Sequence, residues 1–419
     1  MSADASGVDQ RETLKHPFFS IVLVSAVALG CGASKKPANT AAKPQASEEK
    51  APAGTPTDLS PNVARDRRSE PGVRAPAKPL VVGKARDAKC GKIAGPFDTP
   101  NELLAGRLKV STPANGKVVP PPSPEAPTNE EESRIVVDTG KEGFAIVAKE
   151  TFQLDPDRYE PDADAPNKPG SLDVEAVKFL KATYRDEERL DVVPVEIGTG
   201  DAKLRAYAAR PKAPNAPPGR DTALVLGLLV AHPDGTLQNV GFYVRGEHVR
   251  NATGNALVGC TRVAERIAAT LAPGPRALER EAGSRRIADV SGDEELTITV
   301  PADYIVVPVA SGARVYKLKL LSLYAGNITV AIGSEADKHA PRDADATVEG
   351  TLLGQSTKWR GKKTEKGGFL FAAEPLDAKD KGKTDARSAE VLVKANRQGK
   401  VLDELRGVAE TLAVTKKTK

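Results

Sequence analysis

Side chains suited to catalysis or metal binding are scarce in this chain. It contains four histidines, and three of them, His232, His248 and His339, lie beyond the first 30 residues. None belongs to an HxH, HExxH or CxxC unit with the spacing of metal ligands, and His232 directly precedes the turn sequence Pro233-Asp234-Gly235. We therefore predict three solvated turn histidines, no metal site and no cofactor.

Other short motifs are incomplete. Gly198-Thr-Gly200 lacks the third glycine of a dinucleotide-binding turn, and Gly361-Lys-Lys-Thr364 lacks the leading glycine of a P-loop. Gly354-Gln-Ser356 lacks the second glycine of a nucleophile elbow. The carboxylates of 155–164 lack the glycine and the glutamate that an EF-hand loop requires, so we expect a solvated acidic loop. These patterns predict no catalytic residues.

One cysteine occupies a chemically informative place. Cys31 ends an apolar run that begins at Ile21, and Arg11 and Lys15 precede that run. A positive region, about a dozen apolar residues and a small residue before the cut are typical of a secretory signal peptide. The run is too short for a membrane-spanning helix, which needs about 20 apolar residues. A buried apolar helix with an incidental cysteine is the alternative interpretation.

The ending Ala28-Leu29-Gly30-Cys31 resembles the lipobox of bacterial lipoproteins. This resemblance implies cleavage by signal peptidase II after residue 30 and a diacyl modification, of the palmitate type, on Cys31. Because Gly32 rather than aspartate follows, resemblance to enterobacterial sorting implies the outer membrane, facing the periplasm. Ala28 stands where leucine is commonest, which leaves cleavage by signal peptidase I as an alternative.

With Cys31 lipidated, Cys90 and Cys260 would be the two remaining thiols. In an exported, oxidising compartment two thiols favour a disulfide. A bridge across about 170 residues would destabilise the unfolded chain by about 5 kcal/mol in the chain-entropy model. Two unpaired thiols are the alternative.

Composition separates a tether from a folded body. Residues 32–80 contain no aromatic side chain and many prolines, so they cannot bury enough apolar area to fold. We predict a signal peptide at 1–30 and a disordered tether at 31–88 that holds the body clear of the membrane. The net charge is +5, with no basic block interleaved with aromatics, and we therefore predict no nucleic-acid partner.

The body is predicted to combine strands with a few helices. Alternating, β-branched runs indicate strands, at 103–110, 135–137, 144–147, 190–197, 202–208, 223–231 and 240–244, and again at 296–300, 315–323, 327–332, 350–358, 368–373 and 390–394. Helices are expected at 171–190, where Ser171 is a suitable N-cap, and at 261–272 and 398–413. Trp359, the single tryptophan, is expected to lie half-buried at a strand end.

Two alignments suggest an internal duplication. Pro113–Pro120 aligns without gaps to Pro301–Pro308, and 263–272 aligns to 404–413. Chance matching in a chain rich in Ala, Pro and Val is the alternative. The predicted fold class is α+β, with two related units at 89–276 and 290–416, each an antiparallel sheet closed by a C-terminal helix. The outline of each unit resembles the PsbP/DcrB-like fold found in several small exported proteins.

These observations favour a non-catalytic cell-envelope lipoprotein that acts as a membrane-anchored binding or scaffolding protein with an envelope protein as its partner. Two alternatives stay open. One is an exported hydrolase whose site is assembled from separated Ser, Asp and His residues. The other is an accessory subunit of an envelope secretion or transport complex, with the tether setting its reach.

Overall fold

The computed structural model describes residues 77–80, 89–120, 127–138, 142–158, 170–185, 190–198, 202–212, 222–246, 254–323, 326–333, 340, 344–383, 387–397 and 399–417. The predicted signal peptide, Cys31 and the tether as far as residue 76 lie outside the described residues. β-sheet predominates in the described part, accompanied by three α-helices, so the fold class is α+β or mainly β. No helix among the described residues is long and apolar enough to cross a membrane.

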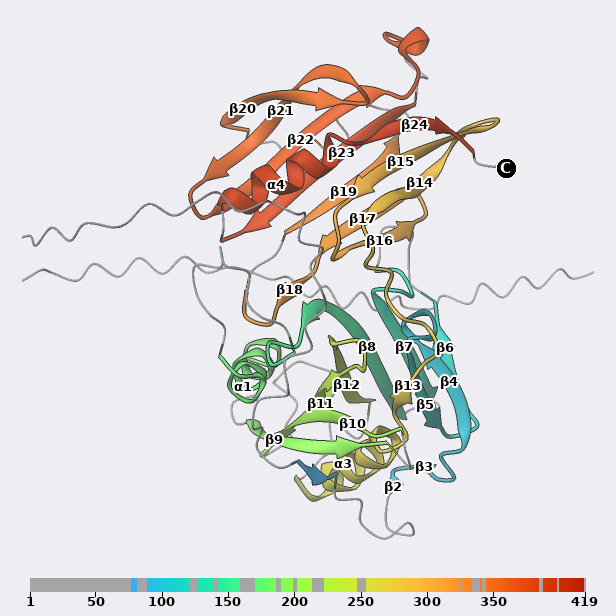
Figure 1. Cartoon of the computed structure of the whole chain (residues 1–419). Coiled ribbons are helices and arrows are strands. Elements are labelled where there is room, and N and C mark those ends of the chain that lie inside the picture. Colours follow the sequence, from blue (N-terminus) through green and yellow to red (C-terminus); the bar gives the residue numbers. More distant parts are fainter. Residues whose placement is uncertain are drawn as a thin grey trace, which may run out of the picture. The chain divides into compact units, whose positions relative to one another are not determined.

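Eight strands of the first half and β18 of the second form a nine-stranded sheet (Figure 1). Its strand order is β1-β9-β10-β11-β12-β8-β7-β6, and β18 pairs with β8 outside this path. The bounds are β1 (Lys78–Pro79), β6 (Gly116–Val119), β7 (Glu132–Asp138), β8 (Glu142–Leu154), β9 (Leu190–Ile197), β10 (Leu204–Pro211), β11 (Thr222–Ala231), β12 (Thr236–Gly246) and β18 (Lys319–Leu320).

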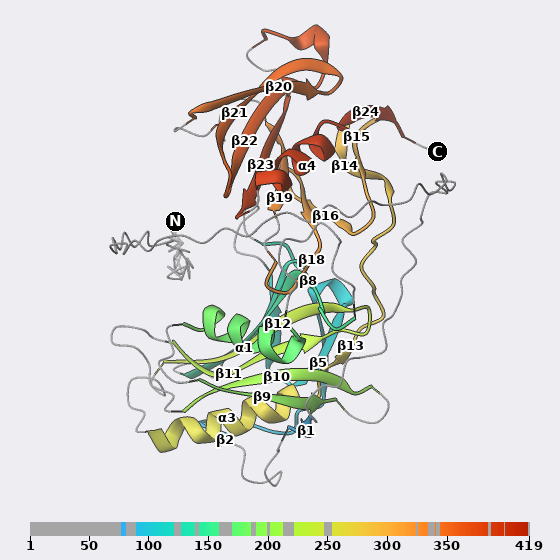
Figure 2. The same ribbon diagram turned by 60° about the vertical axis from the view of Figure 1, so that its left-hand side comes forward.

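Two helices cover opposite faces of this sheet, α1 (Leu172–Thr183) and α3 (Gly254–Ala268) (Figure 2). Along β10, Ala206 and Ala208 join the core beneath α3, while Tyr207 and Ala209 join the core beneath α1. Successive side chains of a strand point to opposite faces, so β10 serves both cores. The neighbouring strand β11 is also buried on both faces, and for this reason its sequence is a continuous apolar run.

A second small sheet and a disulfide complete the first half. The strands β13 (Ala272–Pro273), β5 (Leu108–Thr112) and β4 (Thr99–Leu103) pair in that order, and the 3-10 turn η2 (Leu104–Gly106) joins β4 to β5. The hairpin of β2 (Lys89–Cys90) and β3 (Ile93–Ala94) lies against α3. Cys90 in β2 and Cys260 in α3 form a disulfide with their Cα atoms 4.4 Å apart.

The second half of the chain forms two further sheets. The larger has the order β16-β17-β19-β23-β22-β21-β20, and the smaller has the order β14-β15-β24. The bounds are β14 (Gly283–Ser291), β15 (Glu294–Val300), β16 (Tyr304–Val309), β17 (Gly312–Lys317), β19 (Gly326–Gly333), β20 (Ala346–Leu352), β21 (Gln355–Thr364), β22 (Gly367–Pro375), η3 (Ala378–Asp380), β23 (Ser388–Asn396), α4 (Gly399–Ala409) and β24 (Ala413–Lys416).

The helix α4 packs on β19, β22 and β23, and its apolar face enters the core of the second half. That face consists of Val401, Leu402, Leu405, Val408 and Ala409. Trp359 is fully buried in the same core, so the prediction of a half-buried tryptophan was wrong. The indole lies within β21 rather than at its end, and the sheet together with α4 covers it completely.

The two halves meet along β8. Lys319 and Leu320 of β18 pair in parallel with Gln153 and Leu154 of β8. A separate apolar cluster, the junction cluster, joins the halves; its buried members are Phe152, Leu154, Ile305, Val307, Leu318 and Leu320. Both halves also meet at the buried carboxylate of Glu131, which accepts hydrogen bonds from Tyr316 and, at 2.6 Å, from Arg314.

Several element boundaries differ from the sequence predictions. The first helix ends at Thr183 rather than at residue 190, and Val174 in its first turn is 49 % exposed. The predicted strand 350–358 contains a turn, because Leu353 and Gly354 both adopt positive φ between β20 and β21. Residues 77–80 belong to the predicted tether, yet β1 pairs with β9 and Leu80 is buried, so these residues belong to the first sheet.

Candidate functional site

His232 is the histidine that the structure places, and it is buried rather than solvated. Its side chain is 5 % exposed, and its ring Nε2 lies 3.1 Å from the backbone oxygen of Arg107. Its Nδ1 lies 3.0 Å from the carboxylate of Asp234. The turn after β11 folds onto Arg107, the residue that follows η2 and lies 125 positions earlier in the chain, and this covers the ring. His248 and His339 lie outside the described residues.

The ring of His232 belongs to a buried cluster around Arg107. The guanidinium of Arg107 contacts Glu150 of β8, Asp234 at 2.8 Å and Thr236 of β12 at 2.7 Å. Both Arg107 and Glu150 are almost completely buried. The cluster therefore ties η2, β8 and the β11–β12 turn together. Removing one partner of such a buried pair leaves an uncompensated charge, which is strongly destabilising.

The environment shifts the pKa values of the two carboxyl groups of this cluster, Glu150 and Asp234, in opposite directions. Burial raises the pKa of Glu150, and the nearby charge of Arg107 offsets this only in part. Burial also disfavours the charged form of Asp234, but hydrogen bonds from His232 and Thr236 and the charge of Arg107 outweigh it and hold the pKa of Asp234 well below its usual range. The closed packing around these groups assigns the cluster a structural role.

The described part of the acidic loop, residues 155–158, does not form a metal centre. Asp155 is fully buried, which contradicts the prediction of a solvated loop at this residue, and it accepts a hydrogen bond from the backbone N–H of Asp157 at 3.0 Å. Residues 159–169 lie outside the described part. Among the described residues, no group of three His, Cys, Asp or Glu side chains is arranged to hold a metal ion.

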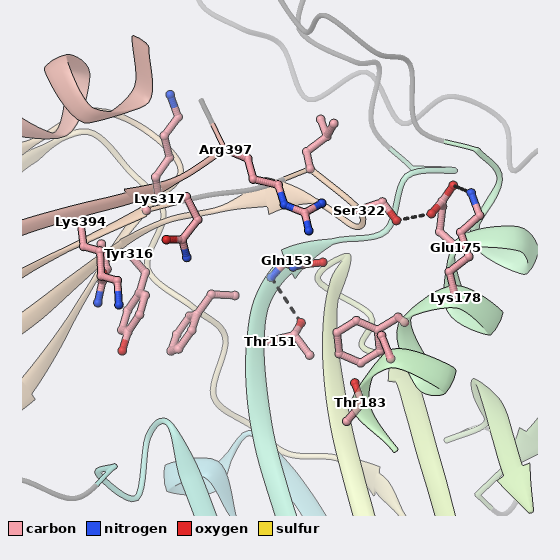
Figure 3. A pocket seen from close by; sticks show the side chains of 17 residues that line it. Thr151, Gln153, Glu175, Lys178, Thr183, Tyr316, Lys317, Ser322, Lys394 and Arg397 are labelled. Carbon is pink, nitrogen blue, oxygen red and sulfur yellow. Dashed lines mark hydrogen bonds and ion pairs between the residues drawn. The ribbon is translucent and has the colours of Figure 1, made fainter. Parts of the chain in front are cut away.

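A cleft of about 890 Å³ lies beside the end of β8 (Figure 3). Its walls come from β8, α1, β17, the turn after β18, β19 and the end of β23. The polar and charged residues that line it are Thr151, Gln153, Glu175, Lys178, Thr183, Lys317, Ser322, Asn327, Lys394, Asn396 and Arg397. A volume of several hundred cubic ångströms is typical of small-molecule sites.

One wall of the cleft is aromatic. Phe152 and Tyr316 stack with their ring centroids 4.0 Å apart and their planes 6° from parallel. The hydroxyl of Tyr316 donates to Glu131, which fixes the ring, and Phe179 of α1 lines the cleft as well. Burial and the adjacent carboxylate of Glu131 raise the pKa of Tyr316 well above its usual value, so its hydroxyl stays protonated at neutral pH.

The charged lining is mostly cationic. It holds Lys178, Lys317, Lys394 and Arg397 against the single carboxylate of Glu175. Glu175 is already occupied: it pairs with Lys178 at 3.0 Å and accepts a hydrogen bond from Ser322. Although burial opposes ionisation, these two bonds lower the pKa of Glu175, so it is charged at neutral pH.

Backbone conformation in the cleft is unusual. Seven non-glycine residues of the described chain have positive φ, and three of them line the cleft: Phe152 at 52°, Ser322 at 76° and Arg397 at 72°. Such conformations cost on the order of 1–3 kcal/mol each, and they cluster at functional sites. Phe152 also lies where the β8–β12 register shifts, and irregularities of this kind re-aim side chains.

No motif in the sequence indicated this cleft. Its lining spans Thr151 to Arg397 and comes from both halves of the chain, so no local spacing could reveal it. Comparison with protein-family models, with curated proteins and with solved structures gave no match. The candidate site therefore rests on its own geometry and chemistry.

Proposed function

We propose that this protein is a lipid-anchored, non-catalytic binding protein of the bacterial cell envelope, held through Cys31 at the periplasmic face of the outer membrane. The Cys90–Cys260 disulfide carries the proposal. Structural disulfides persist in exported, oxidising compartments and are rare in the cytosol. The bridge therefore agrees with the export signal that ends at Ala28-Leu29-Gly30-Cys31.

We further propose that the body consists of two related units, at 89–276 and 290–416. Strand order supports this proposal: the path β6-β7-β8-β12-β11-β10-β9 corresponds, strand by strand in chain order, to β16-β17-β19-β23-β22-β21-β20. The small sheets correspond too, β13-β5-β4 to β24-β15-β14. In each half the long helix stands between the last strand of the large sheet and the last strand of the small one.

A pair of threonines after these helices supports the same relationship. Thr270 accepts a hydrogen bond from the backbone N–H of Ser111 at 2.8 Å, and Thr411 accepts one from the backbone N–H of Thr299 at 3.0 Å. Thr270 and Thr411 are matched by one of the two sequence alignments. Ser111 and Thr299 precede the matched Pro113 and Pro301 of the other by the same two residues. In both halves, therefore, a backbone N–H two residues before one aligned segment donates a hydrogen bond to the equivalent threonine of the other aligned segment.

The cleft supports binding over the hydrolase alternative. Its lining supplies lysine, arginine, amide and aromatic groups, which suit recognition of a ligand. His232, the histidine within the described residues, is buried against Arg107 and does not line the cleft. Cations and aromatic side chains that surround a concave site are typical of binding pockets.

Anchorage is tested by replacing Cys31 with Ser in the full-length protein. We expect the variant to lose incorporation of labelled palmitate and to leave the detergent phase on partitioning. The matched control is Ala28→Leu, which brings the ending closer to the common lipobox and should keep both properties. Membrane retention and detergent partitioning of Cys31→Ser at the level of the unmodified chain would overturn the proposal.

A further inference from the structure

We propose that the cleft beside β8 binds an acidic sugar, that is, a saccharide that carries a carboxylate or a phosphate. The inference deepens the binding role proposed above and rests on it, but it does not require the lipid anchor. It follows from three features of the cleft: its charge, its hydrogen-bonding groups and its aromatic wall.

The charge of the lining selects an anion. Lys394 and Arg397 are exposed at the end of β23, and the guanidinium of Arg397 extends toward the middle of the cleft (Figure 3). Two of the four lining cations are paired, Lys178 with Glu175 and Lys317 with Glu404, and Glu175 also accepts a hydrogen bond from Ser322. An arginine presents parallel donors that match a carboxylate or a phosphate, and a lysine adds a point charge. Together these groups favour a ligand with one localised negative group.

The uncharged lining suits a sugar. Gln153 of β8 points into the cleft between Arg397 and Ser322, and its Oε1 is buried without a hydrogen-bond partner among the described residues (Figure 3). A buried amide oxygen without a partner is destabilising, and a hydrogen bond from a ligand hydroxyl would relieve that cost. Asn327 and Asn396 add further amide groups that can pair with hydroxyls. A plain anion such as inorganic phosphate would leave most of these groups unused.

The aromatic wall provides a surface for a sugar ring. Tyr316 is the partly exposed ring of this wall; the buried Phe152 stacks on it, and the hydroxyl of Tyr316 donates a hydrogen bond to Glu131. The C–H face of a pyranose packs on such apolar walls while its hydroxyls point to polar groups. The left-handed backbone at Phe152, Ser322 and Arg397 sets this arrangement before a ligand arrives. A preformed site loses less free energy to ordering on binding.

The inference is tested by titrating the full-length protein in detergent with matched probes: glucuronate, glucose 6-phosphate, glucose and inorganic phosphate. Binding is followed by isothermal titration calorimetry. We expect at least one acidic sugar to bind at least tenfold more tightly than both glucose and inorganic phosphate. The comparison of glucuronate with glucose 6-phosphate identifies which anionic group the cleft prefers. Equal affinity for glucose, equal affinity for inorganic phosphate, or no binding of either acidic sugar would each overturn the inference.

Substitutions then locate the site. Arg397→Gln and Lys394→Gln should each weaken binding of the preferred probe about tenfold, which corresponds to about 1.4 kcal/mol. Lys362→Gln, at an exposed lysine of β21 that does not line the cleft, is the matched control and should bind normally. Unchanged affinity in both cleft variants would overturn the assignment. Failure here with normal palmitate incorporation would refute the ligand class alone, and the opposite outcome would refute the anchor alone.

Discussion

Replacing Leu412 with Ala should destabilise the second half of the protein selectively. Leu412 directly follows the last turn of α4 and is 1 % exposed within the core formed by the second-half sheets and α4. Truncation of a fully buried leucine typically costs about 2–5 kcal/mol, because the transfer free energy is lost and a cavity remains. The expected loss in the free energy of unfolding is about 3 kcal/mol, the middle of that range.

The chain contains its own reporter for this measurement. Trp359 is the single tryptophan and is fully buried in the same core as Leu412. Its fluorescence in a urea titration therefore follows unfolding of the second half. With a urea dependence of about 1.5–3 kcal/mol per molar, a loss of about 3 kcal/mol lowers the midpoint of the Trp359 transition by about 1–2 M.

The matched control is Leu271→Ala. Leu271 holds the corresponding place after α3 and is fully buried in the core of the first half. The clusters that contain Leu271 and Leu412 share no member among the described residues, and the junction cluster connects the halves. Leu271→Ala should therefore move the Trp359 midpoint much less. Far-UV circular dichroism, which reports on secondary structure of the whole body, should show that the first half unfolds at a lower urea concentration. An unchanged Trp359 midpoint in Leu412→Ala, or an equal shift in both variants, would refute the reasoning.

Two further predictions concern the first half. The double variant Cys90→Ser/Cys260→Ser should lose up to about 5 kcal/mol of unfolding free energy, the chain-entropy value for a loop of about 170 residues; an unchanged urea midpoint under non-reducing conditions would contradict this. Asp234→Asn should show a pH-dependent loss of stability. Because the pKa of Asp234 is lowered by its hydrogen bonds with His232 and Thr236 and by the charge of Arg107, which together outweigh burial, its contribution is fully present above its unfolded-state pKa of about 4. That contribution is lost as the pH falls through the lower pKa of the folded state. The difference in unfolding free energy between the natural chain and Asp234→Asn should accordingly be large at pH 7 and shrink in strong acid, and a pH-independent difference would argue against the assignment.

Strands with a local signal were predictable from the sequence. The range 190–197 coincides with β9, and 223–231 matches β11 to within one residue, because a β-branched or continuous apolar run between turn residues needs no distant information. The predicted strand 350–358 was wrong for an equally local reason. Leu353 adopts a φ of 52° there, a conformation that leucine does not favour and that its residue type therefore does not predict. Gly354 was the one residue that indicated a turn.

Burial of polar residues was not predictable in the same way. His232 and Asp155 stand in turn-like sequence, which favours exposure, yet both are buried. The atoms that cover the ring of His232 belong to Arg107, which is far away in the chain. Trp359 is likewise covered by distant strands and by α4. A single sequence contains no local signal for such pairings, since they arise from topology rather than from spacing.

The position of the cleft follows from the place where the two proposed units differ. In the first half the connection from β8 to β9 carries α1, which supplies Glu175, Lys178 and Phe179 to one wall. The opposite wall comes from β17, β19 and β23, which form the middle of the second sheet. If the units descend from one ancestor, the cleft combines α1, which lies in the longer of the two corresponding connections, with the shared framework of the other unit. Substitutions in α1 should then alter ligand recognition without disturbing the strand framework common to both.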